Sequence, residues 1–142
     1  MLRLGWFGLA EGAAGDHRGQ LTLVGFNVNV VPIPEAALPA TLSIVLVAVI
    51  EADMPAELTA AGKIQLSSHF SAPDETVMFA GQQSLDVPPL PWPEVPPRIQ
   101  LVVAGQATFQ RYGLYTARVR IDIPGHEPLL GERGLWVLAP PH

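Results

Sequence analysis

The sequence predicts an all-β protein: an antiparallel Greek-key β-sandwich, immunoglobulin-like in layout, with about eight strands in a single domain over residues 1–142. Apolar and polar residues alternate with period two along most of the chain, and these stretches are rich in β-branched residues. Fifteen prolines and thirteen glycines divide the chain into short segments. Short alternating segments without long helical periods are typical of sandwiches and barrels.

The alternation defines eight segments, each of which we expect to form a strand. They lie near Leu4–Ala10, Gln20–Val31, Thr41–Ala52, Lys63–Ser71, Thr76–Asp86, Ile99–Gln110, Leu114–Ile123 and Leu130–Leu138. Turn sequences such as GDHRG, SAPDE and PGHEP separate them. One segment, DMPAELTAAG, predicts a helix of about two turns, because Pro55 suits a first helical position and Gly62 suits a helix end.

The amino-acid composition excludes several classes of binding partner and of active-site chemistry. The net charge is −5, and one lysine accompanies seven arginines that are spread along the chain. Because no basic stripe exists, nucleic acid is not expected as a partner. The chain has no cysteine, which excludes disulfides, thiolate metal sites and cysteine nucleophiles. Nearly half of the residues are apolar, which argues against disorder and predicts more apolar surface than one small core requires.

The apolar segments do not predict a membrane protein. The N-terminal MLRLGWFGLAEGAAG has an arginine and a tail of small residues, but two glycines interrupt its apolar run, so we interpret it as a strand rather than a signal peptide. The longest apolar run, Leu42–Ile50, is too short to span a bilayer, which needs ~20 residues. We therefore expect a cytoplasmic protein that does not bind membranes.

The strand from Leu114 carries the most specific fold signal. Tyr115, Ala117 and Val119 alternate with polar residues, so one face is expected to be core and the other wet. A glycine two residues before Tyr115 matches the tyrosine corner of Greek-key sandwiches, in which the tyrosine hydroxyl bonds to a backbone group. The alternative is that Tyr115 only begins a strand. Either interpretation favours a sandwich over a closed barrel.

Three stretches carry a resemblance to a known family. They are GLAEGAAGDHRGQLTLVGFNVNVV, the proline-led PATLSIVLVAVI, and ATFQRYGLYTARVRIDIPGHEPLLGERGLWV near the end. Together they are similar to a family of small uncharacterised bacterial all-β proteins, a domain of unknown function. The matching positions are turn glycines, alternating strands and a tyrosine, and Gln20 stands where lysine is commoner. The resemblance covers both ends and thins out between Glu51 and Pro97, and it implies a fold without implying an activity.

Catalytic and metal-binding patterns are absent from the sequence. It contains no nucleophile elbow, phosphate loop, zinc-protease motif or EF-hand spacing. Isolated candidate residues remain. Histidines could bind a metal, loop carboxylates could bind calcium, and a carboxylate pair could serve acid–base chemistry. Each has a simpler interpretation as a solvated or strand-end residue. These are His17, His69, His126 and His142; Asp16, Asp53, Asp74 and Glu75; and Glu51 with Asp53. We therefore expect no enzyme activity and no cofactor.

The segment Val87–Arg98, VPPLPWPEVPPR, holds six prolines and permits two interpretations. Its PEVPPR fits the P-x-x-P-x-R pattern that SH3 grooves bind as a polyproline II helix. Proline cannot donate to a strand ladder, however, so the run also suits an ordered extended crossing between two parts of the fold. We favour the crossing, with Trp92 at least half buried against the body of the protein.

The main functional prediction concerns a row of valines. In Leu42–Ile50 the residues Val45, Val47 and Val49 line the face opposite the expected core. We expect this row to lie in a protein–protein interface, most simply of a two-fold homodimer. The alternative is a cover by the chain itself, from VPIPEAALP or from the proline segment.

Two classes of function follow. The first is a non-catalytic interaction or assembly module that self-associates, with Val45, Val47, Val49 and Trp92 as its interface residues. The second is a sandwich that binds a small ligand or a metal through loops at one end, with hydrolysis as an option. A stable oligomer favours the first class, and a monomer with a polar pocket at one end favours the second.

Overall fold

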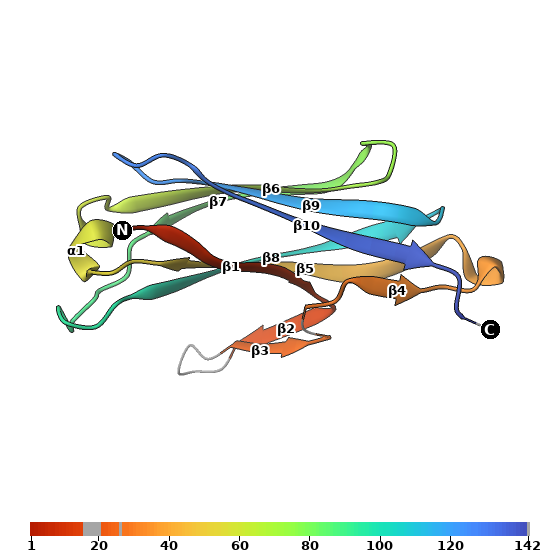
Figure 1. The fold of residues 1–142 in the computed structure, drawn as a ribbon, viewed down its shortest axis with the longest axis horizontal. Coiled ribbons are helices and arrows are strands. Elements are labelled where there is room, and N and C mark those ends of the chain that lie inside the picture. Colours follow the sequence, from red (N-terminus) through yellow and green to blue (C-terminus); the bar gives the residue numbers. More distant parts are fainter. Residues whose placement is uncertain (16–20, 26, 142) are drawn as a thin grey trace.

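The structure is a β-sandwich of two sheets, as the alternating sequence predicts (Figure 1). It is a computed structural model that describes residues 1–15, 21–25 and 27–141. The smaller sheet has three strands in the order β1 (Arg3–Ala10), β5 (Ala40–Glu51) and β8 (Arg98–Phe109). The larger sheet has five, in the order β4 (Val30–Pro32), β10 (Leu129–Leu138), β9 (Gly113–Asp122), β6 (Lys63–Ser71) and β7 (Val77–Asp86).

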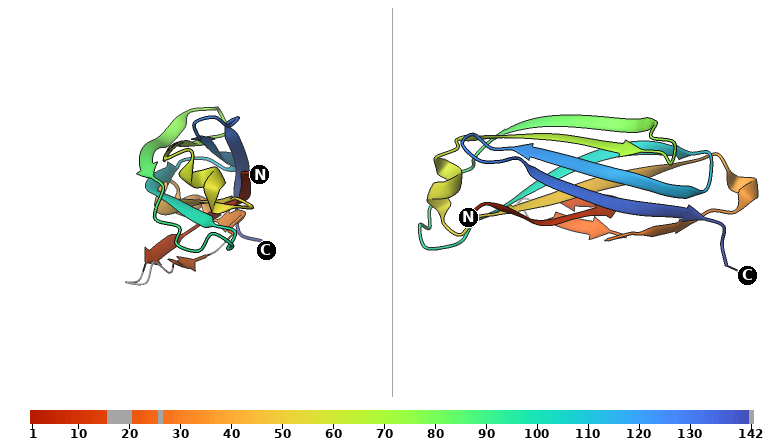
Figure 2. Two further views of the ribbon diagram at one scale, coloured as in Figure 1. Left: turned by 90° about the vertical axis from the view of Figure 1, so that its left-hand side faces the viewer. Right: turned by 45° about the horizontal axis from the view of Figure 1, so that its top comes forward.

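Smaller elements close the two ends of the sandwich. The helix α1 (Pro55–Thr59) caps one end and a 3-10 turn, η1 (Glu35–Ala37), lies at the other (Figure 2). The predicted helix is confirmed: Pro55 is its first residue, the backbone N–H groups of Asp53 and Met54 donate to the Glu57 carboxylate, and Gly62 ends it with a φ of +73°. Glycine meets no steric penalty in that left-handed conformation.

The prediction of one strand over Gln20–Val31 is wrong. Gln20 lies outside the described residues, and the rest divides into β3 (Leu21–Val24) and β4. A turn between them contains Gly25 and Asn27 with φ values of +64° and +58°, a conformation that extended chains do not adopt. β3 forms a two-stranded hairpin with β2 (Gly12–Gly15), which the alternation did not predict because GAAG has no apolar periodicity.

The sandwich is mixed rather than purely antiparallel. β4 runs parallel to β10, with Val31 opposite Val137, whereas the other strand pairs are antiparallel. The Trp136 N–H donates to the Asn29 carbonyl at 2.8 Å, and the Ile33 N–H donates to the Leu138 carbonyl at 2.9 Å. Consequently β1 joins the smaller sheet and β4 joins the larger one, so the N-terminal part of the chain connects the two layers.

The core lies between the sheets and is centred on three aromatic rings. Phe70, Phe109 and Tyr115 are fully buried. The Tyr115 ring stacks on Phe70 with centroids 5.9 Å apart and meets Phe109 edge to face at 4.8 Å. These are the offset and T-shaped arrangements that aromatic pairs prefer, and each adds about 0.5–1.5 kcal/mol beyond the burial of apolar area. The rings therefore join β6 and β9 of one sheet to β8 of the other.

The predicted tyrosine corner is confirmed. The Tyr115 hydroxyl donates to the Arg111 carbonyl at 2.8 Å, within the turn that joins β8 to β9. Arg111 also reaches across to the loop between β6 and β7, where its guanidinium donates to the Asp74 carboxylate at 3.0 Å. Gly113 has a φ of +139°, and a Cβ there would lie 2.9 Å from Pro73 of the same loop. Two neighbouring turns are thus fixed to each other at this end of the sandwich.

Removing the Tyr115 hydroxyl should lower stability without changing the fold. We expect Tyr115→Phe to reduce the free energy of unfolding by about 0.5–1.5 kcal/mol, because the Arg111 carbonyl loses its buried donor. Urea denaturation measures the change, with the exposed-site variant Ser84→Ala as a control that should stay within ~0.5 kcal/mol of wild type. An unchanged midpoint for Tyr115→Phe would contradict the role of the hydroxyl bond.

The Asp74–Arg111 contact should make stability depend on pH in the acid range. Hydrogen bonds from Thr76 and the charge of Arg111 lower the pKa of Asp74 below its ordinary value of 3.8. A lowered pKa in the folded protein stabilises it above pH 3.8, and this contribution is lost as the pH falls through the folded-state value. We therefore expect Asp74→Asn to be less stable than wild type at neutral pH and to converge with it below pH 3.8. Denaturant titrations at several pH values test this, and a pH-independent difference would contradict it.

Candidate functional site

The predicted valine interface is not a free surface. Val45 and Val47 are buried within the chain, and only Val49 is partly exposed. With Ala10 they form a second apolar cluster on the outer side of the three-stranded sheet, and Trp6, Leu23 and Val102 pack against it. The expectation that the valine row faces a partner is therefore wrong for Val45 and Val47, because the chain supplies its own cover.

The cover comes from segments other than the two expected. A register shift in β1 between Leu4 and Trp6 turns Trp6 onto the outer face of the sheet. Its indole then lies over Gly8, where a Cβ would overlap a ring carbon, so a larger residue at position 8 would displace the indole. Leu23 comes from the β2–β3 hairpin, which stands against the outside of the smaller sheet (Figure 1). Neither VPIPEAALP nor the proline segment takes part in this cluster.

The proline segment crosses between the sheets as predicted, but the expected burial of Trp92 is wrong. Residues 87–97 join β7 of the larger sheet to β8 of the smaller one, and the Trp92 side chain is 69% exposed. Val87 and Leu90 pack against the core and Pro97 is buried. The Val95 N–H donates to the Trp92 carbonyl at 3.2 Å, so a turn lifts the tryptophan away from the body.

The same turn bears on the P-x-x-P-x-R pattern. A polyproline II ligand needs a continuous extended helix, whereas here the turn interrupts residues 93–96. Pro97 accepts a hydrogen bond from the Ala52 N–H, and Arg98 already belongs to β8. This segment therefore exposes Trp92 and Val95 at the tip of a loop, and it does not present the continuous extended helix that SH3 grooves bind.

A row of exposed apolar side chains lies on the outer face of the five-stranded sheet, on the three strands at its β4 edge. Strand register places Val30 of β4 beside Trp136 of β10, and Trp136 beside Leu114 of β9, with Leu138 in the next row of β10. These four side chains are between 38% and 46% exposed. We call them the outer apolar row. The sequence does contain a signal for them, since Leu135–Leu138 reads LWVL and so places apolar residues on both faces of one strand.

A groove of about 450 Å³ lies on the same face, nearer the middle of the sheet. We call it the arginine groove, and six of its lining residues are Ser67, His69, Arg118, Arg120, Leu130 and Glu132. Leu130 is 70% exposed, and the alkyl stems of the two arginines add further apolar surface. Arg118 pairs with Glu132 at 3.2 Å and with Glu75 at 3.6 Å, while Arg120 pairs with Asp122 at 3.1 Å.

A second, polar hollow of about 280 Å³ lies at the tyrosine-corner end. Its lining includes Asp74, Thr76, Thr108, Gln110 and Arg111. Its two charged groups, Asp74 and Arg111, already neutralise each other through their ion pair. The hollow therefore offers hydrogen-bonding groups without a free charge.

The candidate metal and acid–base residues do not converge. Within residues 1–15, 21–25 and 27–141, no three His, Asp or Glu side chains lie close enough together to hold a metal ion. Arg3 binds both Glu51 and Asp53, at 3.3 Å and 2.8 Å, so this carboxylate pair is occupied by a guanidinium. His126 contacts the Glu127 carbonyl at 2.7 Å. Asp16, His17 and His142 lie outside the described residues.

Comparison with known proteins adds no identification. No family model matches the chain, and no curated protein matches it in sequence. Among the described residues, none of the helices has the length and apolar character needed to cross a bilayer. The surfaces described above are therefore the basis for a functional interpretation.

Burial of the valine row changes the expected effect of substituting it. We expect Val47→Glu to lower the free energy of unfolding by about 3–5 kcal/mol, because a buried carboxylate has no partner there. Ala104→Glu is the matched control, since Ala104 lies opposite Val45 on the same face but is exposed; it should change stability by less than ~0.5 kcal/mol. Urea denaturation distinguishes the two. A Val47→Glu protein as stable as wild type would show that the valine row is not covered in solution.

Proposed function

We propose that the protein is a non-catalytic interaction and assembly module that associates with a second copy of itself through the outer face of the five-stranded sheet. The outer apolar row is the observation that carries this proposal. A sheet face that meets water normally carries polar residues, and three neighbouring strands here present Val30, Trp136 and Leu114 side by side. Tryptophan is also among the residues that contribute most to binding energy at interfaces.

The charges beside the row suit a second copy. Arg118 lies opposite Glu132 in the β9–β10 register, so one face carries both signs of charge next to an apolar patch. In a two-fold interface each surface meets its own copy, and a face with both signs lets arginines approach carboxylates of the partner. A stable interface needs about 800 Å² from each partner, so the contact would extend from the row onto this charged region.

The proposal also includes the detailed topology of the sandwich. We infer an immunoglobulin-like Greek key from three features: the sheet orders β1-β5-β8 and β4-β10-β9-β6-β7, an N-terminal segment shared between both sheets, and a tyrosine corner at the start of β9. Membership of the uncharacterised bacterial all-β family and a cytoplasmic location remain predictions from the sequence. Such sandwiches often act as binding modules, but fold alone does not identify a function.

One observation favours the alternative of a small-ligand sandwich. The polar hollow beside Asp74 and Arg111 lies at one end of the sandwich, where that alternative expects a site. It would suit a small polar molecule that hydrogen-bonds to Thr108 and Gln110. A monomeric protein that binds such a molecule there would favour this alternative over self-association.

Substituting Trp136 should separate the copies. We expect the wild type to sediment as a dimer at micromolar concentration and Trp136→Lys to weaken the dimer at least roughly 30-fold, the equivalent of a tryptophan hot spot of about 2 kcal/mol. The control is Val77→Lys, which adds the same charge at an exposed valine of β7, on the far edge of the same sheet. This control should leave the dimer intact. A monomeric wild type, or a Trp136→Lys protein that dimerises normally, would overturn the proposal.

A further inference from the structure

The five-stranded sheet ends in an unprotected edge at β7. In the described part of the chain, β6 is the only strand that pairs with it (Figure 2). The free side of an end strand presents backbone N–H and C=O groups to other strands, and proteins usually guard it with charges, proline, a bulge or a covering segment. Val77–Leu85 contain no charged residue and no proline. The register shifts only at Met78, so the edge from Phe79 onward is regular and open to pairing.

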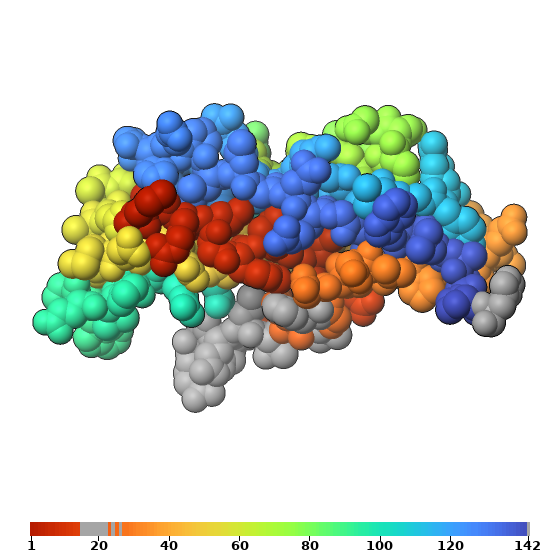
Figure 3. Space-filling view, in the orientation of Figure 1, coloured from red at the N-terminus to blue at the C-terminus, as the bar shows by residue number. Residues whose placement is uncertain are grey.

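The three other sheet edges have features that hinder pairing. β4 has only three residues and ends in Pro32. β1 is irregular near its start and lies against β10 (Figure 3), and its Leu9 carbonyl accepts a hydrogen bond from the Val28 N–H at 3.1 Å. On β8, the Val102 carbonyl accepts a hydrogen bond from the Gln83 side chain of β7 at 2.9 Å. Within the described residues, the edge that a second copy can best offer to β7 is therefore its own β7.

The core-side residues of β7 match when the strand pairs with its own copy. Phe79 and Leu85 lie three residues to either side of Gln82, opposite the buried residues Phe70 and Ile64 of β6. Both side chains are only partly buried within one chain. Antiparallel pairing centred on Gln82 sets Phe79 of each copy opposite Leu85 of the other, and apolar cross-strand pairs stabilise a sheet. Each copy then covers the partly exposed apolar edge of the other.

The outer-face residues of β7 match in the same register. Ala80 and Ser84 lie two residues to either side of Gln82, so small side chains stand opposite each other across the join. The two Gln82 side chains meet at the centre, where each amide can both donate and accept a hydrogen bond. Like charges directly opposite each other would destabilise the pair, but Phe79–Leu85 are uncharged. The side chains on both faces of β7 thus favour a second β7 as the partner strand.

We propose that β7 of one copy pairs antiparallel with β7 of a second copy, in the register that places Gln82 opposite Gln82. The contact is two-fold and closed, and it joins the two five-stranded sheets into one. Antiparallel pairing keeps the outer faces of both copies on the same side. The outer apolar rows, at the β4 ends of the joined sheet, therefore stay free, and the sheet-face contact proposed above can join two such pairs into a tetramer. This inference shares with the proposed function only the idea that the partner is a second copy.

A charge-swap experiment tests both the contact and its register. All proteins carry Trp136→Lys, which weakens the sheet-face contact and leaves β7 unchanged. A single strand edge offers less than the about 800 Å² per partner of a stable interface, so sedimentation is measured at roughly 100 µM and above. We expect this parent protein to dimerise there. Adding Gln82→Lys or Gln82→Glu sets two like charges opposite each other, and each should weaken the dimer at least roughly fivefold.

The decisive result comes from mixing the two variants. The proposed register sets position 82 of one copy opposite position 82 of the other, so Gln82→Lys and Gln82→Glu proteins should form a 1:1 heterodimer at least as stable as the parent dimer. Gln65→Lys and Gln65→Glu are the matched controls, because Gln65 is exposed on the same face of the neighbouring strand β6. These controls should associate as the parent does, alone and mixed. Both positions are exposed, so all variants should unfold at the parent's urea concentration.

Amide hydrogen exchange gives an independent readout of strand pairing. Association of the parent should slow exchange at alternate residues of Phe79–Leu85, because their N–H groups gain partners across the join. Three outcomes would overturn the inference: a parent that stays monomeric at its highest soluble concentration, a mixture no more stable than the separate variants, or unchanged exchange along β7. The sheet-face proposal is tested separately by Trp136→Lys in the micromolar range, and its control position Val77 lies outside the paired segment, so either proposal can fail alone.

Discussion

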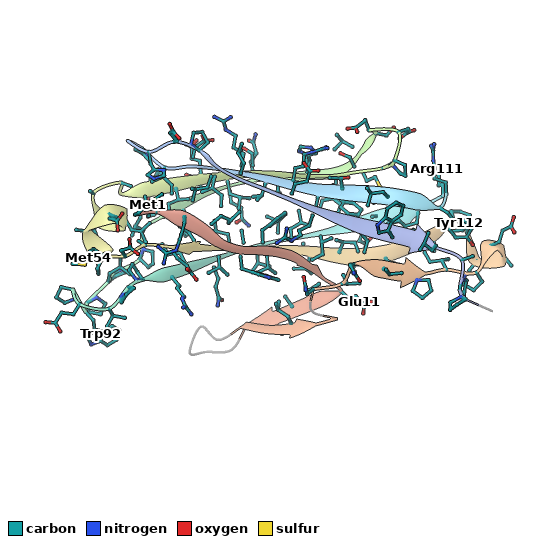
Figure 4. The ribbon with its side chains drawn as sticks, viewed as in Figure 1. Met1, Glu11, Met54, Trp92, Arg111 and Tyr112 are labelled. Atoms are coloured by element: carbon teal, nitrogen blue, oxygen red, sulfur yellow. The ribbon has the colours of Figure 1, made fainter. Side chains whose placement is uncertain are left out.

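The packing of Tyr115 between the sheets is the constraint on which the rest of the structure depends. Its ring contacts Phe70 of the same sheet and Phe109 of the other, while its hydroxyl holds the Arg111 carbonyl of the preceding turn. One side chain therefore contacts both layers and holds the position of a turn. Asp74 extends this fixed region to a second loop by binding the Arg111 side chain. The loops at this end of the sandwich are therefore held to each other. The exposed Trp92 side chain lies at the opposite end of the molecule (Figure 4).

Where a strand has one buried and one wet face, the sequence was sufficient to predict it. Lys63–Ser71 alternates except at Ser68, a polar residue on the buried face, and β6 has these bounds. Alternation fails where the two faces have the same character. The prediction over Gln20–Val31 missed the switch from the hairpin to β4, because that switch depends on left-handed residues and on a parallel pairing with a strand more than a hundred residues later. The alternation within a strand does not indicate which distant strand it pairs with.

Prediction from sequence is limited in a similar way for the candidate binding surfaces. The sequence correctly identified an excess of apolar residues on the second face of β5, but burial depends on what lies above that face. The cover consists of Trp6, turned outward by a register shift, and Leu23 from a hairpin without apolar periodicity. Likewise, the proline segment predicted a crossing, while the exposure of Trp92 depends on a single turn at its tip. Local composition predicts that a surface is apolar; only the tertiary arrangement decides whether water reaches it.

The outer faces of the two sheets differ: one is covered by the chain itself, and the other is open. On the three-stranded sheet, Trp6 and Leu23 from the N-terminal part of the chain cover Val45 and Val47. These valines are therefore shielded from water within a single chain. The five-stranded sheet has no such cover in the part of the chain that the structure describes, and both the outer apolar row and the arginine groove remain open on it. β4 adds to this asymmetry. By pairing with the end of β10 it places Val30 beside Trp136 and widens the apolar row instead of burying it. The chain thus covers the apolar outer face of one sheet and enlarges that of the other, which is why the proposed contact between copies lies on the larger sheet.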